Sequence, residues 1–142
     1  MTGSPPLTLT LAHSGMHRAP PSLALLRDAA AAAAKWAWID IELDAVRDKA
    51  GLLQACATAL AFPATFGGNW DALADCLQDL SWRHDRGYVI HLRGAGAFSR
   101  AAPAEWATAL EIFTASATYW KTRGRPFIVL AGGVTGLSEF TW

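Results

Sequence analysis

Residues 62–77 read Phe-Pro-Ala-Thr-Phe-Gly-Gly-Asn-Trp-Asp-Ala-Leu-Ala-Asp-Cys-Leu and join a loop to an acidic helix. Gly67 and Gly68 break the chain, and Asn69 is a favourable N-cap for a helix predicted over about residues 70–82. At about 100° per residue, three leucines fall on one side of this helix and three aspartates on the other: Leu73, Leu77 and Leu80 against Asp71, Asp75 and Asp79. One face therefore packs on a core, and the opposite face is acidic.

The acidic helix lies in an acidic middle third of a chain whose net charge is zero. Residues 40–80 hold seven acidic and two basic side chains, a net charge of −5. No lysine or arginine lies between Asn69 and Ser81, so each pair of aspartates four residues apart costs about 0.2–0.5 kcal/mol. A neutral chain lacks the basic field that drives nucleic-acid binding, whereas a local acidic block indicates a basic protein partner. The alternative is a solvated helix face.

The rest of the chain alternates between predicted strands and predicted helices. Alternating apolar and acidic residues predict a strand over 38–44, and two apolar runs predict strands over 88–92 and 127–130. Helices are predicted between them, one capped by Asp48 and a longer one beginning at Pro103. This alternation implies right-handed crossovers and an α/β fold: a small parallel sheet of about three strands packed with helices.

Residues 1–37 are expected to form an N-terminal extension to a main domain at residues 38–142. Leu-Thr alternation over 7–11 predicts a short strand, and the alanine-rich region predicts a helix over about 22–35. No segment approaches the ~20 apolar residues of a membrane span. The N-terminus lacks a signal-peptide core, and two cysteines are too few for a disulfide-dependent secreted domain. We therefore expect a cytoplasmic protein that does not associate with membranes.

Residues 62–77 resemble the signature of the barstar family, intracellular inhibitors of barnase-type ribonucleases. The resemblance is carried by a proline, an aromatic residue, glycine and asparagine, followed by Asp-Ala-Leu and Asp-Cys-Leu at fixed offsets. It covers residues 38–131, with a strand, two helices, a strand, a helical segment and a closing strand in the family's order. It implies a barstar-like fold.

The resemblance further implies a protein that binds a basic extracellular-type or toxin ribonuclease, in an immunity or antitoxin role, and that is not an enzyme. The acidic helix and the loop before it would block the cationic active site of the nuclease. Asp75 would enter the phosphate-binding pocket, and Asp71 would pair with basic residues beside it. The expected partner-binding residues are Thr65, Gly67, Gly68, Asn69, Asp71, Ala74, Asp75, Gln78 and Asp79.

Two small residues depart from the family's pattern. Thr65 and Ala74 stand where the family has aromatic contact residues, and truncated aromatic anchors remove much of an interface's binding energy. The departure favours a cognate nuclease different from the prototype. It also leaves open an alternative, a barstar-fold binding module for a partner that is not a nuclease.

Nothing else in the sequence forms a convincing catalytic, metal or cofactor site. His13 and His17 have a metal-like spacing, but Gly15 between them breaks the helix that would bring them together. The remaining candidates receive structural interpretations: a charged turn at His84 and Asp85, a structural strand histidine at His91, a buried inert thiol at Cys76 and a turn at Gly94–Gly96. We therefore expect no metal and no cofactor.

Overall fold

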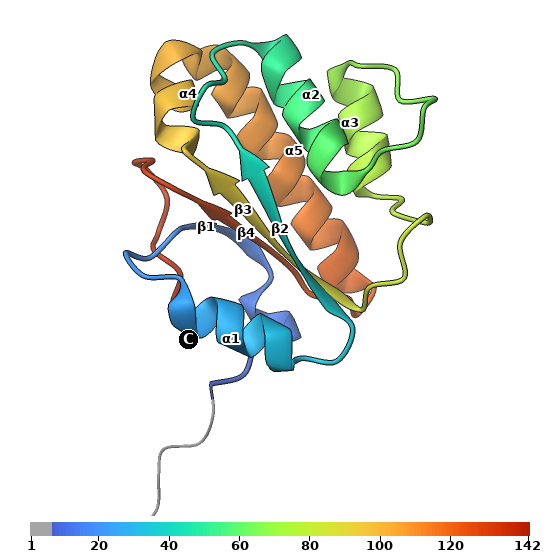
Figure 1. Cartoon of the computed structure of the whole chain (residues 1–142), viewed down its shortest axis with the longest axis vertical. Coiled ribbons are helices and arrows are strands. Elements are labelled where there is room, and N and C mark those ends of the chain that lie inside the picture. The colour runs from blue at the N-terminus through green and yellow to red at the C-terminus, as the bar shows by residue number, and fades with distance from the viewer. Residues whose placement is uncertain (1–6) are drawn as a thin grey trace, which may run out of the picture.

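Four parallel strands form the sheet in a computed structural model that describes residues 7–142 (Figure 1). Their order is β1-β4-β3-β2, with bounds Gly15–Arg18, Phe127–Ala131, Gly87–Arg93 and Trp36–Glu42. The sequence predicts the α/β class and three of the strands correctly. The count of three is wrong, because β1 pairs in parallel with β4 and adds a fourth strand.

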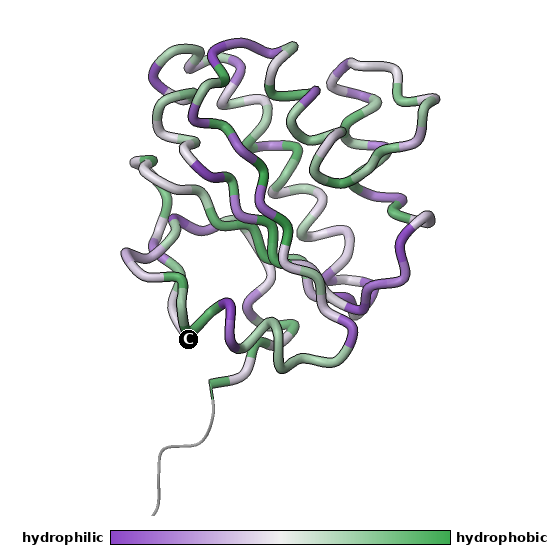
Figure 2. Tube along the Cα trace, viewed as in Figure 1, coloured by the Kyte–Doolittle hydropathy of each residue, from purple (hydrophilic) through white to green (hydrophobic). Residues whose placement is uncertain are grey.

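The two central strands are buried along almost their whole length. Every residue of β4 is buried, as is every residue of β3 before Arg93. Figure 2 accordingly shows long hydrophobic stretches in the sheet. A parallel sheet covered on both faces requires such continuous apolar runs. The edge strand β2 instead alternates towards its C-terminal end, where Ile39 and Ile41 are buried beside the more exposed Asp40 and Glu42.

Helices cover both faces of the sheet. Helix α1 (Ala24–Ala32) packs on one face, where Leu26 and Ala30 meet Val89 and Ile128. The other face carries four helices: α2 (Lys49–Leu60), α3 (Trp70–Leu77), α4 (Ala95–Ala101) and α5 (Pro103–Thr122). The sheet thus separates a smaller core under α1 from a larger core under α2 to α5.

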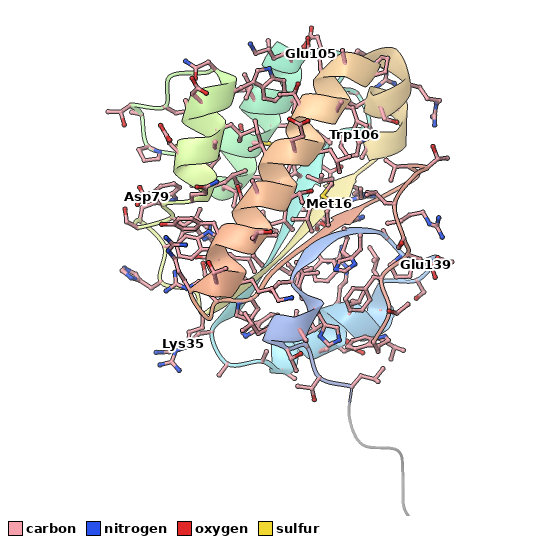
Figure 3. All side chains as sticks on the ribbon, turned by 180° about the vertical axis from the view of Figure 1, so that it is seen from behind. Met16, Lys35, Asp79, Glu105, Trp106 and Glu139 are labelled. Atoms are coloured by element: carbon pink, nitrogen blue, oxygen red, sulfur yellow. The ribbon has the colours of Figure 1, made fainter. Side chains whose placement is uncertain are left out.

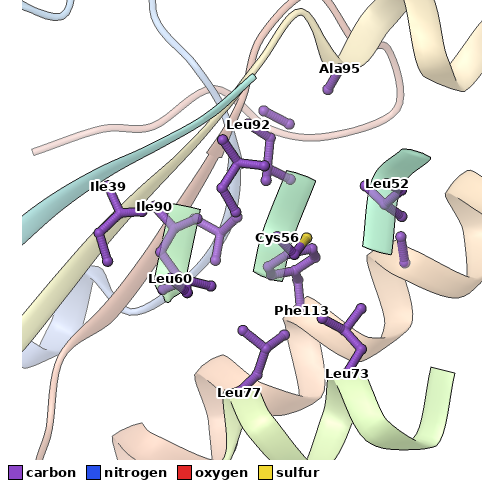
Figure 4. Packing of buried hydrophobic residues seen from close by; sticks show 14 of the residues in the cluster. Ile39, Leu52, Cys56, Leu60, Leu73, Leu77, Ile90, Leu92, Ala95 and Phe113 are labelled. Carbon is purple, nitrogen blue, oxygen red and sulfur yellow. The ribbon is translucent and has the colours of Figure 1, made fainter. Parts of the chain in front are cut away.

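The larger core fixes the helices that carry the acidic surface. Figure 4 shows Leu73 and Leu77 of α3 beside Phe113 of α5, with Cys56 of α2 close by. All four side chains are fully buried. Burial raises the pKa of the Cys56 thiol to about 12, so this thiol is neutral at physiological pH and packs as a small apolar group. Each fully buried leucine contributes roughly 1.5–3 kcal/mol to folding.

The N-terminal extension differs from its predicted structure. Residues 7–10 form no strand, and a 3-10 helix, η1, follows at Leu11–His13. The strand forms later, at β1, which occupies the side of β4 that does not face β3. The strand predicted from the Leu-Thr alternation is therefore wrong, because the segment that pairs with β4 is Gly15–Arg18 and residues 7–11 belong to no strand of the described chain. Residues 1–6 of the predicted extension lie outside the described residues.

Two further boundaries differ from the sequence prediction. The alanine-rich helix is shorter than predicted, ending with α1 at Ala32, and Lys35 then adopts a positive φ of 63° before β2. The Gly94–Gly96 segment begins helix α4 instead of forming only a turn. Gly94 has φ 74°, and a Cβ there would lie 2.0 Å from the Asp44 carboxylate, so only glycine fits.

None of the helices described in residues 7–142 has the length and apolar character needed to cross a membrane.

Candidate functional site

Helix α3 packs on the core through its leucine side chains and is hydrogen-bonded to α5 at its C-terminal end. Leu73 and Leu77 have no exposed surface. The indole Nε1 of Trp120, on α5, donates a hydrogen bond of 2.7 Å to the carbonyl of Leu77. That carbonyl is one of the groups a helix end leaves without an intrahelical donor. The helix is thus fixed relative to the sheet, and its outer face is presented on a rigid support.

The N-terminal end of α3 is capped as the sequence predicts. The Asn69 side-chain oxygen accepts a hydrogen bond of 2.7 Å from the backbone amide of Ala72, and Asn69 itself is extended, with φ −133° and ψ 175°. Gly68 has φ 69°, a left-handed conformation that glycine adopts without strain. Gly67 and Gly68 are both exposed, so the backbone of this loop is open to a partner.

Aromatic side chains support the loop between α2 and α3. The rings of Phe62 and Phe66 lie 5.0 Å apart, and the ring of Trp82 lies 5.9 Å from Phe62. The Trp82 indole also donates to the carbonyl of Leu60, at 3.0 Å. Thr65 lies in this loop and is exposed. The loop therefore has an aromatic base on the protein side and a small polar residue on the solvent side.

The acidic helix is shorter than the sequence predicts. It ends at Leu77 and not near residue 82, so Asp79 lies in the following turn. The carbonyl of Leu77 accepts a hydrogen bond from the Trp120 indole in place of the backbone amide that would extend the helix. Leu80 has a positive φ of 52°, and its side chain is buried in the core. Gln78, half-buried, forms the C-cap. The hypothesis of three aspartates on one helix is corrected to two on the helix and one just beyond it.

The three aspartates are exposed, and the described part of the chain gives them no basic partner. Asp71, Asp75 and Asp79 are all exposed, and none takes part in an ion pair within residues 7–142. Asp79 accepts only a hydrogen bond of 3.2 Å from the hydroxyl of Ser81. Figure 3 shows Asp79 at the margin of the molecule. The carboxylates are thus neither turned inward nor neutralised by the chain's own arginines.

The aspartates of this surface affect the pKa of the Cys76 thiol. Burial raises the pKa of Cys76, and the charges of Asp79 and Asp75 raise it further. Cys76 is half-buried between the core and the aspartates, so the prediction that it is buried is wrong: its place at the edge of the apolar side of α3 leaves part of it exposed. A raised pKa leaves the thiol protonated at neutral pH, so it adds no nucleophile to the site.

A lysine beside α3 was not identified from the sequence. The Lys49 ammonium lies 5.5 Å from the centre of the Trp70 ring, within the range of a cation–π contact. Trp70 is half-buried, as its place near the apolar side of the helix predicts. No pattern along the chain could have revealed this contact, because it depends on how α2 packs beside the start of α3. It places one positive charge next to the acidic surface.

The two departures from the family pattern leave the acidic surface without large anchors. Ala74 is half-buried on α3 between the aspartates, and Thr65 is exposed on the loop. Neither residue offers the area that an aromatic side chain buries in an interface. The expected partner-binding residues therefore lie on the loop before α3, on α3 itself and, for Gln78 and Asp79, just after its end, and the charged ones among them are all acidic.

The other candidate residues have structural surroundings. His91 is buried, and its Nδ1 donates to the Asp40 carboxylate at 3.0 Å. Asp85 pairs with Arg83 at 2.6 Å in the charged turn. The ring of His17 is hydrogen-bonded to the carbonyl of His13, at 2.8 Å, and both histidine rings pack against Phe140. Within residues 7–142 no three His, Cys, Asp or Glu side chains gather as a metal site would require.

Comparison with known protein families identifies the family of this chain. The family model described as "Barstar (barnase inhibitor)" matches residues 36–132, about two thirds of the chain. The matched region begins at β2 and ends just after β4, and it includes α3 and the loop before it. No curated protein matches the chain.

Proposed function

The chain belongs to the barstar family, and from this premise we propose that it inhibits a barnase-like ribonuclease by covering the cationic active site with α3 and the loop before it. Members of the family are inhibitors and not enzymes. The protein that the family inhibits is a ribonuclease, so family membership implies a ribonuclease as the protein partner. The observation that carries the proposal is the set of exposed carboxylates at Asp71, Asp75 and Asp79, which have no basic partner within residues 7–142.

The chemistry of a ribonuclease explains why carboxylates would block it. An enzyme that cleaves RNA gathers lysine, arginine and histidine to hold phosphate groups. A carboxylate accepts the same charge-assisted hydrogen bonds that a phosphate oxygen accepts. Asp75, near the middle of the surface, is proposed to occupy the phosphate-binding position. Asp71, one helical turn earlier, is proposed to pair with the basic residues beside it.

Rigidity of the site would preserve binding energy. The Asn69 cap, the buried leucines and the Trp120 hydrogen bond fix α3 before any partner arrives. A preorganised surface loses little conformational entropy on binding. The partly screened field of three unpaired carboxylates also steers a basic partner into encounter, which raises the association rate at low salt.

The small residues at Thr65 and Ala74 bear on the identity of the partner. They provide no aromatic anchor, so we propose a nuclease whose surface projects larger side chains towards the loop and α3 than the family's prototype target does. The inhibitor would act inside the cell that makes this nuclease, in an immunity role, because an unprotected producer would degrade its own RNA.

Titration of the purified chain into ribonucleases tests the proposal. Barnase itself and nucleases recovered by co-purification from the native cell would be assayed for RNA cleavage at increasing inhibitor concentration. We expect stoichiometric inhibition of the co-purified nuclease and weaker inhibition of barnase. Retention of a partner without nuclease activity, with no inhibition of any ribonuclease, would favour the alternative of a binding module for another protein.

A further inference from the structure

Strand β2 lies at one edge of the sheet, and the edge of β2 that faces away from β3 is free within residues 7–142. Within residues 7–142, β3 is the only strand that pairs with β2. The carbonyl of Lys35 accepts from the amide of Arg86, and the amide of Leu43 donates to the carbonyl of Arg93. Odd-numbered residues of β2 therefore direct their backbone groups towards β3. The even-numbered residues Trp38, Asp40 and Glu42 direct theirs to the free edge.

The charges on β2 do not protect this edge. Exposed strand edges are usually blocked by proline, bulges or unpaired charges. Between Trp36 and Glu42 there is no proline, and the register with β3 is unbroken over all seven residues. Asp40 pairs with Arg27 at 3.3 Å and accepts a hydrogen bond from His91, and Glu42 pairs with Arg93 at 3.2 Å. A strand placed alongside would therefore meet little repulsion.

A groove runs beside the free edge on the face covered by α2. It has a volume of about 400 Å³. Its lining consists of two residues of β2 and five of α2, which are Asp40, Glu42, Gly51, Gln54, Ala55, Thr58 and Ala59. The side of α2 that borders the groove has small residues at every fourth position, namely Gly51, Ala55 and Ala59, so its side chains take up little space there. A second element can approach both β2 and α2 there.

We propose that this edge pairs with the same edge of a second copy of the chain, in antiparallel orientation about a twofold axis. The register that uses the whole strand places Ile39 opposite Ile39 of the second copy and Trp38 opposite its Asp40. This register sets the even-numbered residues of both copies against each other, as hydrogen-bonded antiparallel pairs require. The two sheets become one continuous sheet, and the interface is isologous.

Charges along β2 favour the antiparallel arrangement. The N-terminal end of the strand carries Lys35, which is exposed and takes part in no ion pair within residues 7–142. The C-terminal end is followed by Asp44, which is exposed and takes part in no ion pair within residues 7–142. A twofold axis at Ile39 brings Lys35 of each copy to the level of the acidic end of the other. Figure 3 shows Lys35 at the margin of the molecule.

In such a dimer the groove leaves room for the α2 helices of the two copies to pack beside each other. A twofold axis perpendicular to the sheet keeps both α2 helices on the same face, on either side of the new strand pair. Packed helices lie about 8–10 Å apart, and small side chains permit the shorter distances. Gln54 and Thr58 of each copy would enter the groove of the other. Figure 1 shows β2 as the strand nearest the viewer, with no element in front of its edge.

The test measures the mass of the full chain by sedimentation velocity from micromolar to near-millimolar concentration. We expect a concentration-dependent dimer of twice the 15.2 kDa chain mass. Glu42→Pro removes an outward amide without touching the pairing to β3, so it should weaken dimerisation about tenfold or more, because each copy loses a hydrogen bond. Ala55→Arg, which fills the groove, should do the same.

Matched variants separate pairing from side effects. Glu42→Ala loses the same ion pair as Glu42→Pro but keeps the amide, and Ala115→Arg adds the same charge as Ala55→Arg on an exposed position of α5. Both controls should dimerise like the parent chain, and circular dichroism should show all four variants folded. A parent chain that stays monomeric at every concentration overturns the proposal. So does a dimer that Glu42→Pro and Ala55→Arg leave unchanged.

Discussion

Two groups of carboxylates in the same acidic third of the chain have opposite surroundings. On β2, Asp40 and Glu42 are matched by Arg27, His91 and Arg93. On α3 and just after it, three aspartates have no basic partner among residues 7–142. The first group is satisfied within the fold, whereas the second leaves its charge unpaired, as the proposed binding of a basic partner requires. Net charge along the sequence cannot distinguish these two uses, because the distinction depends on which arginines the fold brings close.

The largest effect is expected for binding when a carboxylate of the unpaired group is removed. Asp75→Ala should weaken the complex with the cognate nuclease by roughly 2–5 kcal/mol, the usual cost of leaving the opposite charge of a buried pair unmatched. Calorimetric titration measures this loss. The melting temperature should not fall, because Asp75 is exposed, takes part in no ion pair within residues 7–142 and is repelled by the neighbouring aspartates.

Asp28→Ala is the matched control for this variant. Asp28 is exposed on α1, on the opposite side of the sheet from α3. It should leave the affinity within error of the parent chain. Equal weakening by Asp28→Ala and Asp75→Ala would mean that the nuclease responds to overall charge, and the distinction between the two carboxylate groups would fail.

The N-cap of the helix that carries the unpaired aspartates is expected to have a smaller effect, on the free energy of unfolding. Asn69→Ala removes the side chain that accepts the amide of Ala72, so it should destabilise the fold by about 0.5–2 kcal/mol. Thermal or urea unfolding measures the change. Asn69→Asp retains a capping oxygen and should recover most of the stability. An unchanged melting temperature in Asn69→Ala would contradict the role of Asn69 as the cap.

The paired group should affect stability in a pH-dependent way. Burial alone would raise the pKa of Asp40, but hydrogen bonds from Trp38 and His91 and the charge of Arg27 outweigh it and hold the pKa below 3.8. Asp40→Asn should therefore cost about 1 kcal/mol at neutral pH. Since the folded-state pKa is the lower one, this stabilisation is present above pH 3.8 and is lost as the pH falls through the folded-state pKa.

Unfolding of both chains in urea between neutral pH and pH 2 checks this sign. The stability difference between the parent chain and Asp40→Asn should shrink as the solution is acidified. A difference that grows on acidification would mean that the pKa of Asp40 is raised on folding and not lowered.

The smallest effect is expected for the exposed pair on β2. Glu42 and Arg93 are more than half exposed, with 59% and 56% of their side-chain surface accessible. Exposed ion pairs are worth little, so Glu42→Gln should change the free energy of unfolding by at most about 0.5 kcal/mol. Chemical unfolding at low and high salt resolves the change. A larger loss would mean that the pairing on β2 is more than surface neutralisation.

Much of the fold could be predicted from the sequence, because local patterns determine it. The alternation through Ile39 and Ile41, the apolar run of β4 and the Asp48 and Asn69 caps all identify their elements correctly. Residues 7–11 were assigned wrongly, because a two-residue period says nothing about whether a neighbouring strand is free. The four-residue strand β1 has no comparable pattern, and its pairing with β4 is a long-range event.

The candidate site could be predicted in its residues but not in its surroundings. The spacing of Asp71 and Asp75 follows from the helix, whereas their lack of ion pairs depends on the placement of every arginine in three dimensions. The end of α3 at Leu77 depends on Trp120, which lies 43 residues further along the chain. Lys49 beside Trp70 likewise arises from packing between helices.

The salt dependence of association tests the central claim most directly, namely that the unpaired carboxylates are what the nuclease binds. The association rate of the parent chain with its co-purified nuclease would be compared with that of a variant carrying Asp71→Asn, Asp75→Asn and Asp79→Asn. We predict a rate that falls steeply with ionic strength for the parent and is slow and nearly flat for the variant. Equal rates and equal salt slopes for the two chains would contradict the account.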